Sequence, residues 1–183
     1  MTNVAPRGVP AVPGISAFPE LNVRTYVMLD GKPGIFFFSL DAASRLAVRL
    51  ARLLCHLPYH VASMSVEARD GWIHYRSLRT HSERPAEFFA RYRPVSPPQA
   101  SRPGTLEHFL TERYCLYTLD RRSRVCRLEI HHRPWPLQAA DAEIARNTLG
   151  DVNGCPLPKV PPILHFSKRQ DMVAWPLTRI SEP

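Results

Sequence analysis

Proline is the sequence feature that most limits what this chain can fold into. It supplies 19 of the 183 residues, about twice the ~5% share typical of proteins. Each proline lacks a backbone N–H donor and is excluded from helix interiors and central strands. We therefore expect short helices and strands joined by rigid connectors. We also expect a Pro-rich N-terminal arm over residues 1–19, followed by a single domain over residues 20–183.

The composition is otherwise that of a globular protein, with 44% hydrophobic and 22% charged residues. No apolar stretch approaches the roughly 20 residues of a membrane span, and the N-terminal residues lack the apolar region of a secretory signal. The four cysteines include no C-x-x-C pair, so a zinc-finger spacing is absent. We therefore expect a cytoplasmic protein with free thiols, and no metal, cofactor or membrane partner.

The charge is strongly basic, at +8 in formal net charge. Only Lys32, Lys159 and Lys168 are lysines, so 21 of the 24 basic residues are arginines. Such a skew indicates recognition of phosphate or carboxylate groups, or a GC-rich genome with no functional cause. Because the arginines are dispersed and no nucleic-acid motif is present, we do not expect nucleic acid as a partner. A nucleic-acid or polyanion-binding protein is kept as the alternative function.

Alternating apolar and polar residues predict a chain made mainly of strands. The predicted strands are 22–29, 35–40, 60–67, 72–79, 86–92, 114–119, 125–132, 164–167 and 172–175. Asp30-Gly31 and Asp70-Gly71 are turn signals that join neighbouring strands into hairpins. Cys115 and Cys126 could meet across a hairpin, although buried free thiols are the simpler interpretation.

Helices are predicted at three places. Leu46, Leu50, Leu53 and Leu54 form an apolar stripe, with arginines on the solvated face. Asp41 can cap this helix and Pro58 ends it. Short helices are also predicted over residues 105–111 and 138–146. The fold class is therefore mainly β (α+β): an antiparallel β barrel or cone of hairpins with two or three short helices.

Six ordered segments resemble the YqjF-like family, an uncharacterised bacterial domain, over about residues 20–176. These segments are Asn22–Val27, Gly34–Asp41, Leu57–Tyr59, Phe109–Tyr114, His131–Leu137 and Leu164–Ser167. The resemblance implies the acetoacetate decarboxylase-like fold, a largely antiparallel β cone or barrel with a central cavity.

Acetoacetate decarboxylases use a lysine as a Schiff-base nucleophile, and a second lysine beside it keeps that amine neutral. In this sequence Tyr59 stands where the first lysine would be, and His60 where the second would be. Neither side chain forms an imine with a carbonyl group. The resemblance therefore implies the fold and the cavity, while the residues argue against Schiff-base decarboxylation. Whether the protein is an enzyme is left open.

The polar lining of such a cavity would come from inward positions next to Pro58 and on the central strands. The candidate ligand-binding residues are Tyr59, His60, Arg79, Glu112, Arg113, Tyr114, His132, Arg24 and Tyr26. An arginine in an apolar cavity binds a carboxylate or phosphate, a histidine serves as acid or base, and a tyrosine donates to an oxyanion. We therefore expect a small-molecule ligand that carries a carboxylate, and leave a homo-oligomer open.

Several residues have simpler structural interpretations. Arg24, Glu112 and Arg113 could form an ion-pair network, and His132 could be a core histidine that faces inward while His131 faces outward. His56 and His60 have the i, i+4 spacing of a helical metal pair, but Pro58 lies between them. A protein-interaction module that uses the Pro-rich arm is a third functional alternative. No G-x-S-x-G supports a serine hydrolase.

Overall fold

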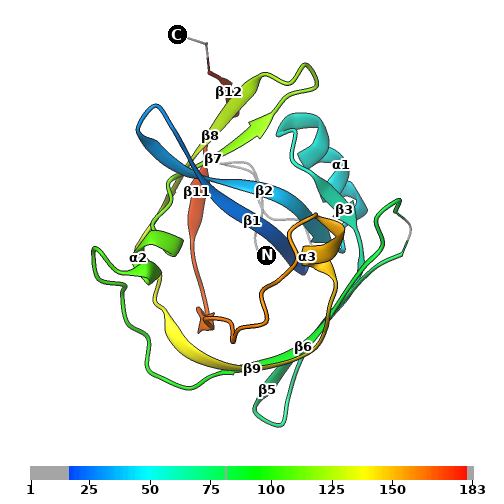
Figure 1. Cartoon of the computed structure of the whole chain (residues 1–183), viewed down its shortest axis with the longest axis vertical. Coiled ribbons are helices and arrows are strands. Elements are labelled where there is room, and N and C mark those ends of the chain that lie inside the picture. Colours follow the sequence, from blue (N-terminus) through cyan, green and yellow to red (C-terminus); the bar gives the residue numbers. More distant parts are fainter. Residues whose placement is uncertain (1–16, 81, 181–183) are drawn as a thin grey trace. The chain divides into compact units, whose positions relative to one another are not determined.

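A computed structural model of the chain describes residues 17–80 and 82–180. Most of the predicted N-terminal arm lies outside these residues. At the end of the arm, Phe18 is buried. The described residues form mostly strands, with three short helices between them (Figure 1). No helix in this part of the chain is long and apolar enough to span a bilayer.

The elements follow one another along the chain in a strand-rich order. They are β1 (Glu20–Leu29), β2 (Lys32–Ala42), α1 (Arg45–Leu54), β3 (Tyr59–Val61), β4 (Ser63–Arg69), β5 (Trp72–Arg79), β6 (Ala86–Pro94), α2 (Leu106–Thr111), β7 (Cys115–Leu119), β8 (Val125–His132), β9 (Gln138–Asn147), α3 (Leu149–Val152), β10 (His165–Phe166), β11 (Met172–Ala174) and β12 (Thr178–Arg179). The predicted fold class, mainly β with short helices, is confirmed.

The strands form two sheets. In the first, the order is β1-β2-β7-β8-β11, with β3 paired to β2 and β12 paired to β8. In the second, the order is β10-β9-β6-β5-β4. The β4–β5 and β7–β8 hairpins are antiparallel as predicted. However, β2 pairs in parallel with both β3 and β7, because the chain returns to it through crossover connections rather than tight turns.

The chain divides into two compact units, which are described separately. Of the described residues, unit 1 comprises 17–23, 38–80, 82–91 and 143–159, and unit 2 comprises 24–37, 92–142 and 160–180. The buried apolar side chains of unit 1 include Leu40, Val48 and Leu149, and those of unit 2 include Leu116 and Leu128. The expectation of a single domain stays a prediction.

Two strands and two turns match their sequence patterns closely. The predicted ranges 72–79 and 125–132 coincide with β5 and β8. Asp30-Gly31 and Asp70-Gly71 both adopt positive φ, at 50° and 73° and at 51° and 75°, which is the conformation that a tight hairpin turn requires.

The predicted helix over residues 138–146 is wrong, because this segment is strand β9. Its alanines and glutamate favour a helix locally. Strand pairing overrides that preference, since Ala139 is the register partner of His165 in β10 and its carbonyl accepts a hydrogen bond from the Val95 N–H.

Helix α1 forms where predicted, with two corrections. Its N-cap is Ser44, whose hydroxyl accepts a hydrogen bond from the Ala47 N–H at 3.3 Å, and not Asp41. Asp41 instead lies buried in β2. The predicted leucine stripe exists, but all four leucines are exposed and Val48 is the buried residue of the helix.

The cysteines of unit 2 illustrate its close packing. Cys115 and Cys126 are buried and free, as the simpler interpretation expected. They do not face each other, because Cys115 is opposite Glu129 and Cys126 is opposite Thr118. A Cβ at Gly34 would lie 2.8 Å from the Cys115 sulfur, so only glycine fits at that point of β2.

Candidate functional site

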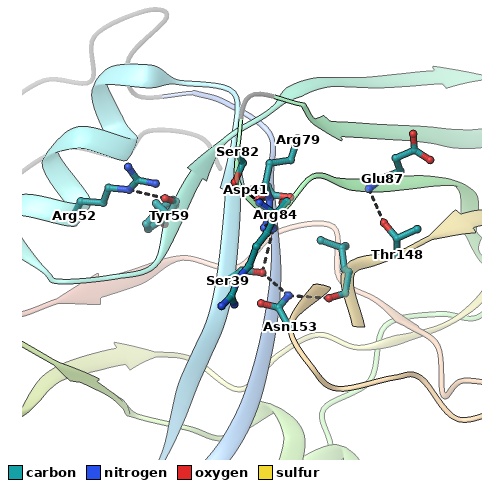
Figure 2. Close-up of polar contacts among 11 residues, drawn as sticks. Ser39, Asp41, Arg52, Tyr59, Arg79, Ser82, Arg84, Glu87, Thr148 and Asn153 are labelled. Carbon is teal, nitrogen blue, oxygen red and sulfur yellow. Dashed lines mark hydrogen bonds and ion pairs between the residues drawn. The ribbon is translucent and has the colours of Figure 1, made fainter. Parts of the chain in front are cut away.

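A buried ion pair dominates unit 1 (Figure 2). The guanidinium of Arg79, at the end of β5, donates from Nε to Asp41 Oδ1 at 2.7 Å and from Nη2 to Ser39 Oγ at 3.3 Å. Its Nη1 donates to the Arg84 carbonyl oxygen at 3.4 Å. Arg79 and Asp41 are each 1% exposed. We call Ser39, Asp41, Arg79 and Asn153 the Arg79 network.

Hydrogen bonds join helix α3 to this network. The Asn153 side chain, just after α3, donates to Ser39 Oγ at 2.9 Å and to the Leu149 carbonyl at 2.8 Å. At the start of α3, Thr148 Oγ1 accepts from the Glu87 N–H of β6 at 2.9 Å. These bonds, drawn in Figure 2, connect β2, β6 and α3 within unit 1.

Burial of Asp41 disfavours its charged form, and the ion pair with Arg79 offsets this cost. Burial raises the pKa of the Asp41 carboxyl group, and the hydrogen bond and charge of Arg79 oppose that rise. A buried carboxylate is costly unless it is paired. Each of the three Arg79 nitrogens already donates to a protein atom, so this predicted ligand-binding residue has a structural role in the network.

Tyr59 is similarly held by protein groups. Its hydroxyl donates to Glu20 Oε2 at 2.5 Å, and its carbonyl accepts from Arg52 Nε at 2.6 Å. The hydroxyl of Tyr75 donates to the Glu20 carbonyl at 2.7 Å. Burial and the neighbouring Glu20 carboxylate raise the pKa of Tyr59 above its usual range. Tyr59 is therefore a protonated hydrogen-bond donor whose partner is Glu20.

His60 lies beside the Arg79 network, because it is the register partner of Asp41 in the parallel β2–β3 pair. Burial, followed by the positive charges of Arg79, Arg52 and Arg84, lowers the pKa of His60 from 6.5 to about 4. The ring is therefore neutral near pH 7, so it can accept a proton or a hydrogen bond but carries no charge to attract an anion.

Unit 2 holds a second cluster, built from β1 and from the end of α2. Arg24 and Tyr26 lie two residues apart on β1 and so point to the same face. The Tyr26 hydroxyl donates to the Leu110 carbonyl at 3.0 Å, and Arg24 Nη2 lies 3.5 Å from the same oxygen. The rings of Tyr26 and Phe109 are 5.2 Å apart between centroids.

Arg113 completes this cluster and has no counter-ion in the described part of the chain. Its guanidinium carbon lies 4.1 Å from the Phe109 ring centroid and 5.6 Å from that of Tyr26. The guanidinium carbon of Arg24 lies 5.8 Å from the Tyr26 centroid. Arg113 Nη1 donates to the Glu112 carbonyl, but its buried Nε has no hydrogen-bond partner. We call Arg24, Tyr26, Phe109 and Arg113 the Arg113 cluster.

The remaining predicted residues adjoin this cluster. The Tyr114 hydroxyl donates to Glu112 Oε2, and the Tyr114 ring stacks on that of His132 at 4.8 Å between centroids. His132 is buried, with Nε2 3.2 Å from the Arg113 carbonyl and Nδ1 2.8 Å from the Arg133 carbonyl. His131 is exposed. The predicted orientations are confirmed, and His132 fits the interpretation as a core histidine.

The predicted site residues thus fall into two groups. Arg24, Tyr26, Glu112, Arg113, Tyr114 and His132 are linked by contacts within unit 2, whereas Tyr59, His60 and Arg79 lie together in unit 1. No ion pair in the described residues includes Arg24, Glu112 or Arg113, which argues against the predicted ion-pair network. Their role in binding a ligand stays a prediction.

Sequence reasoning missed two residues that matter in these groups. Asp41 was predicted to cap a helix. However, Ser39 and Asp41 are two residues apart on an apolar strand, so both side chains point to the same face, which indicated a buried polar pair. Phe109 was also missed, although it lies four residues before Arg113, a spacing that brings two side chains together along a helix. Only its contact with Tyr26 depends on how α2 lies against β1.

A shallow depression of about 340 Å³ in unit 2 is lined by Tyr114, Glu129, Ile130, His131 and Trp175. Of these residues, only Tyr114 was among the predicted ligand-binding residues.

His56 lies beyond the end of α1 with φ of 52°, so His56 and His60 do not share a helix. In the described residues, no group of three metal-ligating side chains could hold an ion.

Comparison with known proteins identifies the family. The sequence model of one protein family, DUF2071, described as an uncharacterized conserved protein, matches residues 1–171. The chain belongs to the DUF2071 family. The uncharacterized protein YqjF of Bacillus subtilis (strain 168) is 49% identical over 181 residues, which cover 99% of this chain and 74% of YqjF. The resemblance stated from the sequence segments is confirmed.

Solved structures show which fold this DUF2071 chain has. An acetoacetate decarboxylase from Legionella pneumophila superimposes with a TM-score of 0.58 at 13% identity, covering 92% of this chain and 69% of the decarboxylase. The enduracididine biosynthesis enzyme MppR, complexed with pyruvate, gives a TM-score of 0.50 at 12% identity, covering 91% and 66%. The acetoacetate decarboxylase-like fold is therefore confirmed; at these identities the likeness shows the fold alone.

Replacing Arg79 tests the buried ion pair. Arg79→Met leaves Asp41 buried without a counter-ion, so we expect the free energy of unfolding in urea to fall by about 3–5 kcal/mol. Asp41→Asn added to Arg79→Met removes the uncompensated charge and should recover part of this loss. The matched control is Arg146→Met, which breaks the exposed pair with Glu87 and should change stability little. Equal effects of Arg79→Met and Arg146→Met would refute the structural role.

The lowered pKa of His60 predicts how stability depends on pH. Between pH 6.5 and about 4 the unfolded chain binds a proton at His60 that the folded protein does not. This residue therefore contributes stability above pH 6.5 that is lost as the pH falls toward 4. In urea unfolding at pH 7 and pH 5, wild type should lose more stability than His60→Gln. The same loss in both proteins would contradict the assignment.

Proposed function

We propose that this protein binds a small carboxylate-bearing molecule at the Arg113 cluster. The observation that carries the proposal is the guanidinium of Arg113, whose Nε is buried and has no hydrogen-bond partner in the described residues. Burying part of a cation without an anionic partner is unfavourable. A ligand carboxylate would accept hydrogen bonds from the guanidinium fork and supply the missing negative charge.

The aromatic rings of the cluster suit this role. Phe109 and Tyr26 hold the Arg113 guanidinium against their rings, which fixes its position and limits the water around it. Arg24 adds a second positive charge beside Tyr26. Because neither arginine is paired with a described carboxylate, both charges favour an anionic ligand.

The other arginines explain why we prefer a small carboxylate over a polyanion. Six surface arginines in the described chain are paired with acidic side chains, namely Arg91, Arg93, Arg124, Arg127, Arg146 and Arg169. Their charge is locally balanced, which does not favour the continuous basic stripe that a nucleic acid requires. The excess positive charge alone therefore gives little support to nucleic-acid binding.

The proposal involves binding without Schiff-base chemistry. Lys32 donates to both Glu129 oxygens at 2.8 Å, and Lys159 and Lys168 are exposed. A Schiff-base lysine needs an amine kept neutral by desolvation or by a neighbouring cation, and none of the three lysines has these surroundings. A cytoplasmic location and a homo-oligomer stay predictions.

Pyruvate is the first probe, because the related fold of MppR was solved as a complex with pyruvate. We expect pyruvate, but not its neutral amide, to raise the thermal unfolding midpoint, since a ligand that binds only the folded state stabilises it. Arg113→Gln should weaken binding in calorimetry about 10- to 100-fold, as expected for losing a charge-assisted hydrogen bond. Acetate and succinate extend the test to ligands with other chains.

Arg122→Gln is the matched control, because it removes the same charge from an exposed turn of unit 2. It should bind like wild type. Arg113→Lys keeps the charge but loses the planar fork, so its affinity should lie between the two. If none of these carboxylates stabilises the protein, or if Arg113→Gln and Arg122→Gln bind equally, the proposal fails.

Borohydride trapping tests the absence of a Schiff base. Borohydride reduces an imine between a lysine and a keto acid to a stable amine, which adds the mass of the reduced ligand to the protein. We expect intact-mass spectrometry of the protein with pyruvate and borohydride to show no such adduct. An adduct that maps to Lys32, Lys159 or Lys168 would show that imine chemistry occurs.

A further inference from the structure

Helix α1 exposes its leucines in an unusual way. Leu46 and Leu50 are 45% and 44% exposed, and Leu53 and Leu54 are 57% and 63% exposed. The same helix buries Val48 at 1% exposure and packs against β3 within unit 1. The helix therefore contacts its own unit through its smaller apolar side chains and leaves its larger ones uncovered.

The helical period explains this arrangement. With 3.6 residues per turn, successive side chains are rotated by roughly 100°. The four leucines occupy one arc whose centre is nearly opposite to Val48. Arg45 and Arg49 lie along one border of that arc, next to Leu53. We call these two arginines and the four leucines the α1 face.

The charge on this face has a single sign. The sequence of α1 contains Arg45, Arg49 and Arg52 and no acidic residue. No carboxylate in the described residues lies within ion-pair distance of Arg45 or Arg49, and both are exposed. An exposed leucine arc bordered by unpaired arginines is typical of helices that lie on anionic membrane surfaces.

We propose that the α1 face docks on an anionic lipid surface, with the leucines at the boundary of the acyl chains and Arg45 and Arg49 on the lipid phosphates. This differs from the sequence-based expectation that no membrane is involved, which rested on the absence of a spanning segment. Docking needs no span, because a helix lying in the interface buries only one face. It is also independent of the proposed carboxylate site in unit 2.

Charge favours a lipid surface over a second copy of this chain. In an antiparallel pair of α1 helices about a twofold axis, the border that carries Arg45 and Arg49 would face the same border of its partner. Four like charges would then lie along one side of the pair with no carboxylate on either helix. A convex ridge of leucines also fits a fluid surface without needing a matching groove.

Sedimentation with lipid vesicles tests the proposal. We expect the full chain to bind vesicles of phosphatidylcholine mixed with phosphatidylglycerol, to bind phosphatidylcholine alone much less, and to be released by high salt. Arg45→Gln with Arg49→Gln should reduce partitioning by at least about tenfold, since each basic residue near an anionic surface strengthens binding. Leu50→Ser with Leu53→Ser should reduce it by a similar factor.

The matched control is Val66→Ser, at an apolar side chain of β4 that is 45% exposed. It should bind vesicles like wild type. All substitutions are at exposed positions, and circular dichroism confirms that each variant is folded. Absence of binding, or equal binding by the α1 variants and Val66→Ser, would overturn the proposal. A dimer in size-exclusion chromatography that Leu50→Ser with Leu53→Ser dissociates would also overturn it, because a second copy would then cover the face.

Discussion

The buried ion pair between Arg79 and Asp41 is the constraint on which unit 1 depends. A guanidinium that is 1% exposed cannot be accommodated without an anion and further acceptors. Asp41 of β2 supplies the anion, and Ser39 and the Arg84 carbonyl supply acceptors. Through Ser39 the same network reaches Asn153 beside α3. Three segments that are far apart in the sequence are therefore held by one buried charge.

The ion pair also determines which arginines remain for recognition. Arg79 and Arg113 were predicted on the same grounds, as arginines at inward positions, yet their surroundings are opposite. Arg79 donates to three protein acceptors, whereas Arg113 rests against two aromatic rings with a buried Nε that has no partner. A saturated guanidinium stabilises a fold, and an unsaturated one can bind a ligand. For this reason the proposed anion site is placed at Arg113 in unit 2 and not at Arg79.

The sequence predicted the strands better than the contacts between them. Alternation located β5 and β8, and the two Asp-Gly turns located the connections between β1 and β2 and between β4 and β5, because these signals act within a few residues. Residues 138–146 were predicted as a helix, since their helix preference is local and the pairing that makes them β9 is not. For α1 the period was right, but a period shows that a helix has an apolar face and not which face touches the protein.

In the candidate site too, local patterns were predicted better than contacts between residues far apart in the sequence. Inward alternation correctly distinguished His132 from His131. The grouping of Tyr26 with Arg113 was compatible with the sequence but could not be derived from it, because it depends on how α2 lies against β1. Asp41 was misassigned because a local capping role competed with a partner 38 residues away.

The most direct test of this account is a crystal structure of the chain grown with pyruvate. We expect a carboxylate within hydrogen-bond distance of Arg113 Nε, with the bonds from Arg79 to Asp41 and Ser39 unchanged. A carboxylate bound by Arg79 in place of Asp41, with Arg113 Nε still unpartnered, would contradict it.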